Sequence, residues 1–355
     1  MKILMISFHF PDYTIEITNA LAKENKGQVY LAIPKNKLSK DRQAKISKKV
    51  TKVYFHKPQK DRQLSNFIHI FKLILKIKQI KPDLIHFQGE NIWFLPIFFS
   101  FFKKTRIDTI HDLEPHIGES SNGKIFTAYF LRRFSQGLIL HSAYLKNEML
   151  EKLKTKAQIA IIPHGGYEGF QIFKKYKEKK NWILFFGRIF KYKGLDYLIK
   201  AEPLIRKKIK DFKIVIAGTG EDFKKYQELI KNKENFIIYN RYISEKLLSE
   251  LFQKANVVVL PYIAGSQTGV IPLAYAFKKP VIATKVGALP EMVIDQKTGF
   301  LIGKEDPKQI AEAVVKMLNQ NQKRQKMGQN GYLFAKKELS LEKIAKKTIT
   351  FYKKC

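Results

Sequence analysis

Short runs of apolar residues alternate along the chain with longer stretches in which apolar residues recur every three or four positions. The runs in the first half are short and nearly continuous, as expected for strands of a parallel sheet that is covered on both faces. These runs lie at residues 3–6, 29–33, 84–87, 107–110, 138–140 and 159–162. The alternation of strand and helix patterns predicts a doubly wound α/β domain.

The pattern restarts after a polar, lysine-rich segment at residues 173–180. New strand-like runs lie at residues 182–186, 214–217, 236–239, 257–260 and 281–283. A length of 355 residues also suits two domains better than one. We therefore predict two Rossmann-like domains, at 1–172 and 173–338, that face each other across a cleft, and a C-terminal helix within 339–355 that packs back on the first domain.

The formal net charge of +35 would attract any polyanion, but it says nothing about the fold. Residues 35–104 hold 17 basic and 4 acidic side chains, so part of the charge is local. The single cysteine, Cys355, cannot form an internal disulfide, which favours a reducing compartment. The longest apolar stretch after the first strand, at 92–102, is too short to span a bilayer, which takes about 20 residues. We expect a cytoplasmic protein that at most lies on the inner face of a membrane.

Polar residues that directly follow predicted strands are the first candidates for a site, because ligands of open parallel sheets bind outside the carboxyl ends of the strands. One predicted strand ends at Gly187, Arg188 follows, and Lys193 opens the next helix. Two cations beside a helix N-terminus suit a diphosphate. The alternative is that both are solvated surface residues of a lysine-rich chain.

Two further loops follow strands in the second half. Gly218 and Gly220 form a turn that either brings backbone close to a ligand or is simply tight. A small-residue loop precedes Pro272, which suits the first turn of a helix. We expect the amides of this loop to point at an anion. The loop residues concerned are Ser266, Gln267, Thr268, Gly269 and Val270.

These motifs occur in a specific order. Gly187-Arg188 and Lys193-Gly194 are followed by AGTGE at 217–221, KPVIAT at 279–284, VGALPE at 286–291 and TGFLI at 298–302. This order resembles the retaining family-4 glycosyltransferases of the GT-B fold and covers the whole second half. The first half is similar more loosely, at residues 84–87, 109–112 and 162–165.

The resemblance implies roles for individual residues. Arg188 and Lys193 would neutralise the diphosphate of a nucleoside-diphosphate sugar and the charge that grows on it as the glycosidic bond breaks. His111 would face the donor sugar, with Asp112 either orienting it or capping the next segment. Glu291 lies in a motif near the diphosphate. The nucleotide base would be held by Arg241, Tyr242 and Ile243. The resemblance implies no metal ion and no cofactor beyond the donor.

The chain departs from the family in two respects. The loop after the first strand, at residues 7–12, lacks the usual glycines, and two acidic residues are missing from the second half. Members commonly carry two glutamates seven residues apart, and counting back from Lys279-Pro280 places these positions at Gly265 and Leu273. Neither carboxylate is present. The residues at 266–268 offer substitute hydrogen bonds, and the alternative is a degenerate, non-catalytic member that binds a glycan or a partner enzyme.

The remaining histidines and one lysine-rich region leave alternatives open. His86 follows the strand pattern and is either functional or a hydrogen-bonded core residue, whereas His141 is expected to be structural. Residues 64–81 are rich in apolar side chains interleaved with lysines, and the apolar stretch 92–102 is followed by Lys103 and Lys104. They form either two core helices with lysines reaching outward or a face that meets anionic lipid.

We therefore predict a glycosyltransferase that moves a sugar from a nucleoside diphosphate to a glycan or lipid-linked acceptor, with retention, in surface polysaccharide biosynthesis. Its expected partners are the nucleotide-sugar donor, that acceptor and an anionic membrane surface. A nucleic-acid partner is disfavoured, because the aromatic residues lie mostly in apolar runs and not on a stacking surface.

Overall fold

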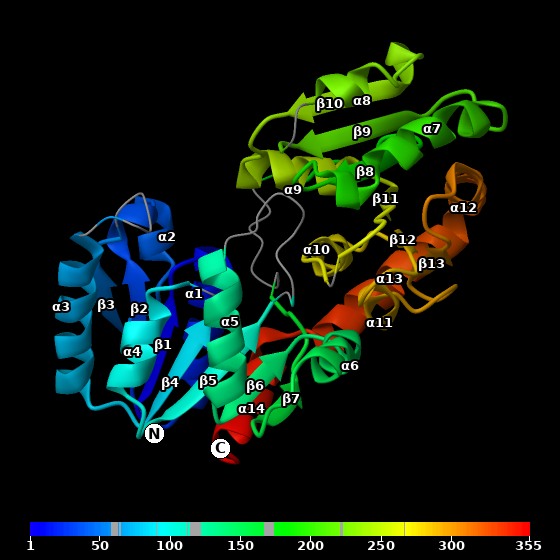
Figure 1. The fold of residues 1–355 in the computed structure, drawn as a ribbon. Helices are drawn as coiled ribbons and strands as arrows, with labels where there is room; N and C mark the ends of the chain where they lie inside the picture. The colour runs from blue at the N-terminus through cyan, green and yellow to red at the C-terminus, as the bar shows by residue number, and fades with distance from the viewer. Residues whose placement is uncertain are drawn as a thin grey trace. The chain divides into compact units, whose positions relative to one another are not determined.

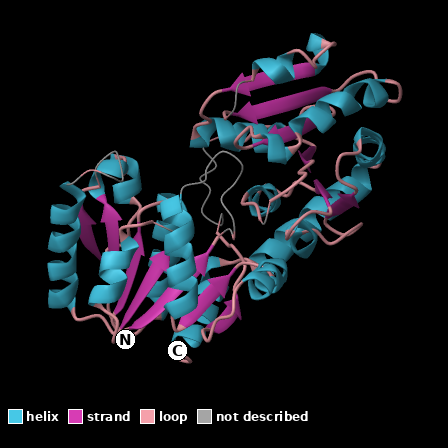
Figure 2. Ribbon diagram, in the orientation of Figure 1, coloured by secondary structure: helices cyan, strands magenta, loops and turns pink. Residues whose placement is uncertain are grey.

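The computed structural model describes residues 1–57, 63, 65–89, 91–111, 113, 122–166, 174–220, 223–265 and 267–355. The chain forms two compact units (Figure 1). The first consists of Met1–Gly166 and Ser340–Cys355, and the second of Tyr167–Leu339. Each unit is a parallel sheet with helices, as the alternation of patterns predicts (Figure 2). Among the described residues, no helix is long and apolar enough to cross a membrane.

The first unit contains a seven-stranded parallel sheet of order β3-β2-β1-β4-β5-β6-β7. Its strands are β1 (Ile3–Ser7), β2 (Val29–Pro34), β3 (Val50–Phe55), β4 (Leu84–Gln88), β5 (Thr105–Ile110), β6 (Gly137–Leu140) and β7 (Gln158–Ile161). Its helices are α1 (Pro11–Glu24), α2 (Lys40–Ala44), α3 (Ser65–Ile80), α4 (Phe94–Ser100), α5 (Asn122–Phe134), α6 (Ala143–Lys152) and α14 (Leu341–Tyr352), with a 3₁₀ turn at Lys35–Lys37.

Strand β3 is absent from the sequence-based expectation. It lies at the sheet edge, and two adjacent exposed residues, Thr51 and Lys52, interrupt its apolar pattern. A search for continuous apolar runs therefore passes over it.

The two faces of the first sheet bury different helices. Ile3 and Met5 of β1 join a core cluster with α1 and α14, whereas Leu4 and Ile6 join another with α3 and α4. This follows from the two-residue period of a strand, which sends alternate side chains to opposite faces. The C-terminal helix α14 thus packs against α1 within the first unit.

The second unit contains a six-stranded parallel sheet of order β10-β9-β8-β11-β12-β13. Its strands are β8 (Trp182–Phe186), β9 (Lys213–Gly218), β10 (Phe236–Asn240), β11 (Val257–Leu260), β12 (Val281–Thr284) and β13 (Gly299–Ile302). Its α-helices are α7 (Leu195–Arg206), α8 (Lys224–Gln227), α9 (Glu245–Lys254), α10 (Val270–Ala276), α11 (Leu289–Met292), α12 (Pro307–Asn319) and α13 (Asn321–Glu338). The 3₁₀ turns are Lys191–Lys193 and Lys233–Asn235.

His86 connects the first sheet to the last helix. Its Nδ1 hydrogen bonds with the Tyr352 hydroxyl of α14, and its Nε2 lies 2.6 Å from Oγ1 of Thr109. The side chain is 1% exposed, and burial, with His141, lowers its pKa to about 3. Of the two alternatives for His86, the structure therefore supports the hydrogen-bonded core residue.

We predict that this buried imidazole makes the fold sensitive to acid. The unfolded chain takes up a proton here below about pH 6.5, whereas the folded chain does so only near pH 3, so the free energy of unfolding falls as the pH drops through that window. His86→Gln should reduce the slope of unfolding free energy against pH by about 1 kcal/mol per pH unit. Urea unfolding at a series of pH values measures this slope.

Tyr352→Phe is the matched control. It removes a hydrogen bond to His86 but leaves the imidazole buried, so it should cost about 1 kcal/mol at every pH without changing the slope. Equal slopes for the wild type and His86→Gln would contradict the prediction.

Candidate functional site

The strand order of the second unit brings two loops together. β8 pairs with β9 on one side and with β11 on the other, so the connections leave this point in opposite directions. Such a switch point leaves a crevice at the carboxyl ends of its two central strands. The loop at 187–193 follows β8, and the loop at 261–269 follows β11. Predicted site residues therefore meet here although they lie far apart in the sequence.

Lys193 is the centre of this region. Its side chain is 7% exposed, and its Nζ donates a hydrogen bond of 2.6 Å to the hydroxyl of Tyr262. The same ammonium lies 4.3 Å from the centroid of the Tyr262 ring, within cation–π distance. Burial lowers the pKa of Lys193 to about 8; Tyr192 opposes this shift and Arg188 adds to it. At neutral pH a mostly desolvated cation is therefore held beside a second cation.

Arg188 is exposed, and its guanidinium carbon lies 5.0 Å from the centroid of the Phe190 ring. Burial lowers the pKa of Lys193 and raises that of Tyr262; the charge of Arg188 adds to the first shift and opposes the second, so the three groups share one electrostatic environment. Two neighbouring cations repel each other, and an anion bound near both would relieve that repulsion.

Tyr262 was not singled out from the sequence. It is 1% exposed, and its hydroxyl lies 3.2 Å from Oγ1 of Thr268. The hydroxyl of Thr284 donates to its carbonyl oxygen. Burial raises the pKa of the phenol, so that Tyr262 stays protonated. The sequence could have pointed to Tyr262 only through its position directly after β11. Its importance depends on its contact with Lys193, which lies 69 positions away in the sequence.

The glycines at 218 and 220 are explained by packing of backbone on backbone. A Cβ at Gly218 would lie 1.8 Å from the carbonyl oxygen of Gly187, and one at Gly220 would lie 2.1 Å from that of Ile189. The amides of Gly187 and Ile189 donate across this contact, to Ala217 and Thr219. Close packing of the loop after β8 on that after β9 therefore accounts for both glycines, and their contact with a ligand stays a prediction.

The loop before α10 is fixed from within. Thr268 is 6% exposed and accepts a hydrogen bond of 3.2 Å from the Val270 amide. That amide, which we expected to face an anion, is thus engaged inside the loop. Gln267 and Gly269 are half-buried in the same loop, and Ser266 lies outside the described residues.

The positions of the missing glutamates have different surroundings. Leu273 is 3% exposed and belongs to the core cluster around α9 and α10, so the position is used for packing. Gly265 has a φ of 122°, and a Cβ there would lie 3.6 Å from the Tyr192 ring.

The other predicted residues of the second unit lie at two further strand ends. Arg241, Tyr242 and Ile243 follow β10; Tyr242 is 78% exposed, and Ile243 is half-buried against the core. Glu291 is exposed in the first turn of α11, after β12. Their assignment to the base and the diphosphate stays a prediction.

In the first unit, His111 directly follows β5. Its Nε2 lies 3.2 Å from Oε1 of Gln88, and its ring is 4.7 Å from the Phe10 ring, centroid to centroid. Burial, reinforced by His141 and His164, lowers its pKa well below the ordinary value, so the imidazole is neutral. Asp112 lies outside the described residues, and the contact of His111 with a donor sugar stays a prediction.

Three histidine rings, those of His111, His141 and His164, lie within 6.2 Å of one another by their centroids. Within the part of the chain that the structure describes, no group of three or more His, Cys, Asp or Glu side chains is arranged to hold a metal ion.

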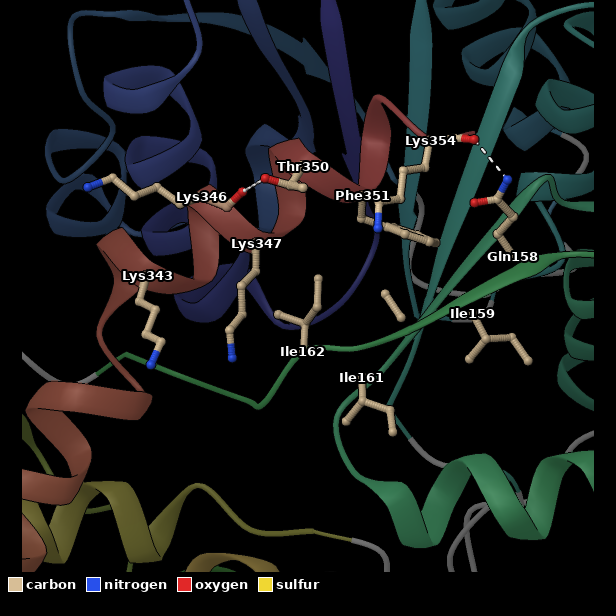
Figure 3. A pocket seen from close by; sticks show the side chains of 11 residues that line it. Gln158, Ile159, Ile161, Ile162, Lys343, Lys346, Lys347, Thr350, Phe351 and Lys354 are labelled. Carbon is tan, nitrogen blue, oxygen red and sulfur yellow. Dashed lines mark hydrogen bonds between the residues drawn. The ribbon is translucent and has the colours of Figure 1, made fainter.

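A groove of about 710 Å³ in the first unit lies beside the edge strand β7 (Figure 3). It is lined by β7 and by α14, which contributes Lys343, Lys346 and Lys347. Lys346 is paired with Glu342 and Glu24. None of the predicted site residues lines this groove, so it is separate from the candidate site.

Comparison with known proteins covers both units. The model of the glycosyl transferases group 1 matches residues 168–334, and that of glycosyltransferase family 4 matches residues 12–165. An uncharacterized glycosyltransferase of Methanocaldococcus jannaschii is 30% identical over 297 residues, which cover 76% of this chain and 73% of that protein. The capsular polysaccharide biosynthesis glycosyltransferase CapM of Staphylococcus aureus is 26% identical over 293 residues, or 75% of each chain.

A solved structure shares the fold. HepE of Anabaena, in complex with UDP and glucose, has a TM-score of 0.77 at 17% identity, and the match covers 100% of both chains. The expected GT-B fold is confirmed. Family models match both halves of the chain, and a relative matches most of its length. The chain therefore belongs to the glycosyltransferases: its second half belongs to the glycosyl transferases group 1, and its first half belongs to glycosyltransferase family 4.

Proposed function

We propose that the protein transfers a hexose from a nucleoside diphosphate to an acceptor hydroxyl, with Arg188 and Lys193 binding the diphosphate. One observation carries the proposal: a Lys193 ammonium that is 7% exposed lies beside Arg188 at the switch point of the nucleotide-binding type of sheet. Burying a cation is costly unless it is compensated. A diphosphate supplies that compensation.

The chemistry follows from where charge develops. As the bond between the sugar C1 and the diphosphate oxygen breaks, negative charge grows on that oxygen, and the two fixed cations stabilise it. The acceptor oxygen forms the new bond to C1, and its proton passes to the departing phosphate. We propose retention at C1 on the same face, in line with the family resemblance, and no requirement for a metal ion.

UDP is the nucleotide that we favour, because HepE, which shares the fold, binds UDP. The exposed ring of Tyr242, with the guanidinium of Arg241 next to it in sequence, offers a stacking surface for the base. The neutral imidazole of His111 is proposed to hydrogen bond with the sugar hydroxyls without adding charge.

The acceptor is proposed to be a glycan or lipid-linked glycan in surface polysaccharide biosynthesis, at an anionic membrane. The relationship to CapM, a capsular polysaccharide enzyme, supports this assignment.

A non-catalytic scaffold is the second candidate. The absence of carboxylates at Gly265 and Leu273 favours it, and the buried Lys193 beside Arg188 argues against it. Titration with UDP and GDP separates the two, because a scaffold need bind neither nucleotide.

We predict that Lys193→Met and Arg188→Met each weaken UDP binding about tenfold or more, since each removes a charge-assisted hydrogen bond. Turnover should fall further, on the order of a hundredfold, because stabilisation of the leaving group is also lost. Methionine fills the volume of Lys193 without a buried charge, so the fold should persist. Isothermal titration with UDP and a sugar-transfer assay measure the two effects.

Lys200→Met is the matched control, since Lys200 lies on the exposed side of α7, paired with Asp196. It should leave UDP affinity unchanged. Wild-type affinity and turnover in the double variant of Arg188 and Lys193 would refute the proposal.

We also predict a pH dependence set by Lys193. Because burial lowers its pKa to about 8 in the free protein, the cation is lost as the pH rises through that value, and kcat/KM for the donor should decline above about pH 8. Tyr262→Phe removes the oxygen that accepts from the ammonium, so the decline should start at lower pH. Lys193→Arg keeps a permanent charge and should abolish it. If kcat/KM declines at the same pH in the wild type, Tyr262→Phe and Lys193→Arg, Lys193 is not the group that causes the decline.

A further inference from the structure

The outer surface of α3 exposes large apolar side chains at regular spacing. Phe67 and Phe71 are each 62% exposed, Ile68 is 58% exposed and Leu75 is 43% exposed. Residues 67, 71 and 75 are four apart and therefore lie along one side of the helix. The opposite side buries Leu73 and others in the core. Core packing thus explains one side of α3 and leaves the other unexplained.

The apolar surface continues over the neighbouring helices. α4 contacts both α3 and α5 within the first unit (Figure 1). The Phe67 ring contacts Trp93, at the start of α4, and the Phe99 ring of α4 contacts Phe130 of α5. Phe99 is 53% exposed, and Phe126 of α5 is 54% exposed. We call the outer side of these three helices the α3–α5 face.

One aromatic ring of this face is braced by a buried cation. The guanidinium carbon of Arg106 lies 4.2 Å from the Phe98 ring and 4.4 Å from the Phe102 ring. Arg106 is 1% exposed, whereas Phe102 is 56% exposed. Cation–π contact therefore fixes the orientation of a ring that remains outside the core.

The charge of the α3–α5 face has a single sign. Residues 65–81, 91–106 and 122–136 contain no aspartate or glutamate and ten lysines and arginines, of which Arg106 and Arg132 are buried. Lys72, Lys76 and Lys78 are exposed on α3 itself. Exposed apolar side chains that gather on one side of a protein mark interaction surfaces in many proteins.

A basic groove borders α3. Its volume is about 490 Å³, and Lys35, Lys72 and Lys76 line it with His56 and His69. Burial, His56 and Lys72 lower the pKa of His69, which reflects the positive potential of this groove. The groove is suited to an anionic head group next to the apolar surface.

We propose that the α3–α5 face docks on the surface of an anionic lipid bilayer, with its aromatic rings among the acyl chains and its lysines at the head groups. Apolar side chains combined with basic ones are what interfacial binding uses. Two copies of this face would place like charges opposite each other, which disfavours a second copy as the occupant. The 16 residues of α3 are too few to span a bilayer, so the contact is peripheral.

This inference rests on the proposed function, because a membrane-linked acceptor gives the enzyme a reason to bind a membrane. The test of membrane binding needs neither donor nor acceptor. The full-length protein is sedimented with vesicles of phosphatidylcholine alone and with vesicles that also contain phosphatidylglycerol. We expect binding at physiological salt only to the second kind, and weaker binding at higher salt.

Two pairs of substitutions test the contributions of charge and of apolar contact separately. Lys72→Glu with Lys78→Glu should weaken binding by about thirtyfold or more, since each basic residue near an anionic surface contributes roughly a factor of five. Ile68→Ser with Phe71→Ser should weaken it by about tenfold or more, because two exposed apolar side chains no longer insert. Both pairs change exposed positions, and circular dichroism melting checks that the fold is kept.

The matched controls lie elsewhere on the chain. Lys343→Glu with Lys347→Glu makes the same charge change in the groove of Figure 3, and Leu333→Ser removes an apolar side chain that is 53% exposed on α13. Both should bind vesicles as the wild type does. Equal loss in the Lys343 and Lys347 variant would mean that total charge governs binding and would overturn the assignment to this face.

Three other results would overturn the proposal. They are no binding to the anionic vesicles, equal binding by the wild type and both α3 variants, and a dimer in sedimentation velocity that the α3 variants dissociate. The Lys193→Met variant separates this question from catalysis, because it should lose UDP affinity while binding vesicles normally. Failure of the wild type to bind anionic vesicles while it still binds UDP would refute only the membrane face.

Discussion

The contact between the Lys193 ammonium and Tyr262 is the interaction on which the second unit's site depends. An ammonium that is 7% exposed loses much of its hydration, and that loss must be offset locally. The phenol oxygen at 2.6 Å and the ring at 4.3 Å offset part of it, but both are neutral groups. The remaining imbalance, increased by Arg188, makes the site attractive to an anion. The preference for an anion that we propose for this site would thus exist before any ligand binds.

This contact requires the loops after β8 and β11 to be held at a fixed position relative to each other. The pairing of β8 with β11 sets their distance, the glycines at 218 and 220 let the loop after β8 lie against that after β9, and Thr268 fixes Tyr262 from the other side. Backbone packing and the geometry of the proposed site are therefore the same feature here. A side chain at either glycine would displace residues 187–189 and the cation next to them.

The sequence was sufficient for what depends on local pattern. Arg188 and Lys193 could be predicted because a strand, a turn and a helix start follow one another directly. Tyr262 could not, because a tyrosine after a strand gains meaning only from its contact with Lys193. The same holds for His86, whose role was undecided until Tyr352, 266 residues away, was found beside it. Strand β3 was missed for the opposite reason, since its local pattern was too weak.

Local pattern also cannot say which of two apolar sides of a helix is buried. Residues 64–81 were rich enough in apolar side chains for either a core helix or a lipid-binding one, and α3 turns out to have both a buried side and an exposed one.

The exposed side of α3 bears on why the first unit carries so much positive charge. Arg188 and Lys193 account for two cations in the second unit, whereas the 17 basic residues at 35–104 lie in the first unit. A donor diphosphate cannot be the reason for that excess, because its proposed cations lie in the other unit. Since Lys72, Lys76 and Lys78 lie on α3 together with exposed aromatic rings, the proposed contact with an apolar and anionic surface explains these three better than any small soluble anion does.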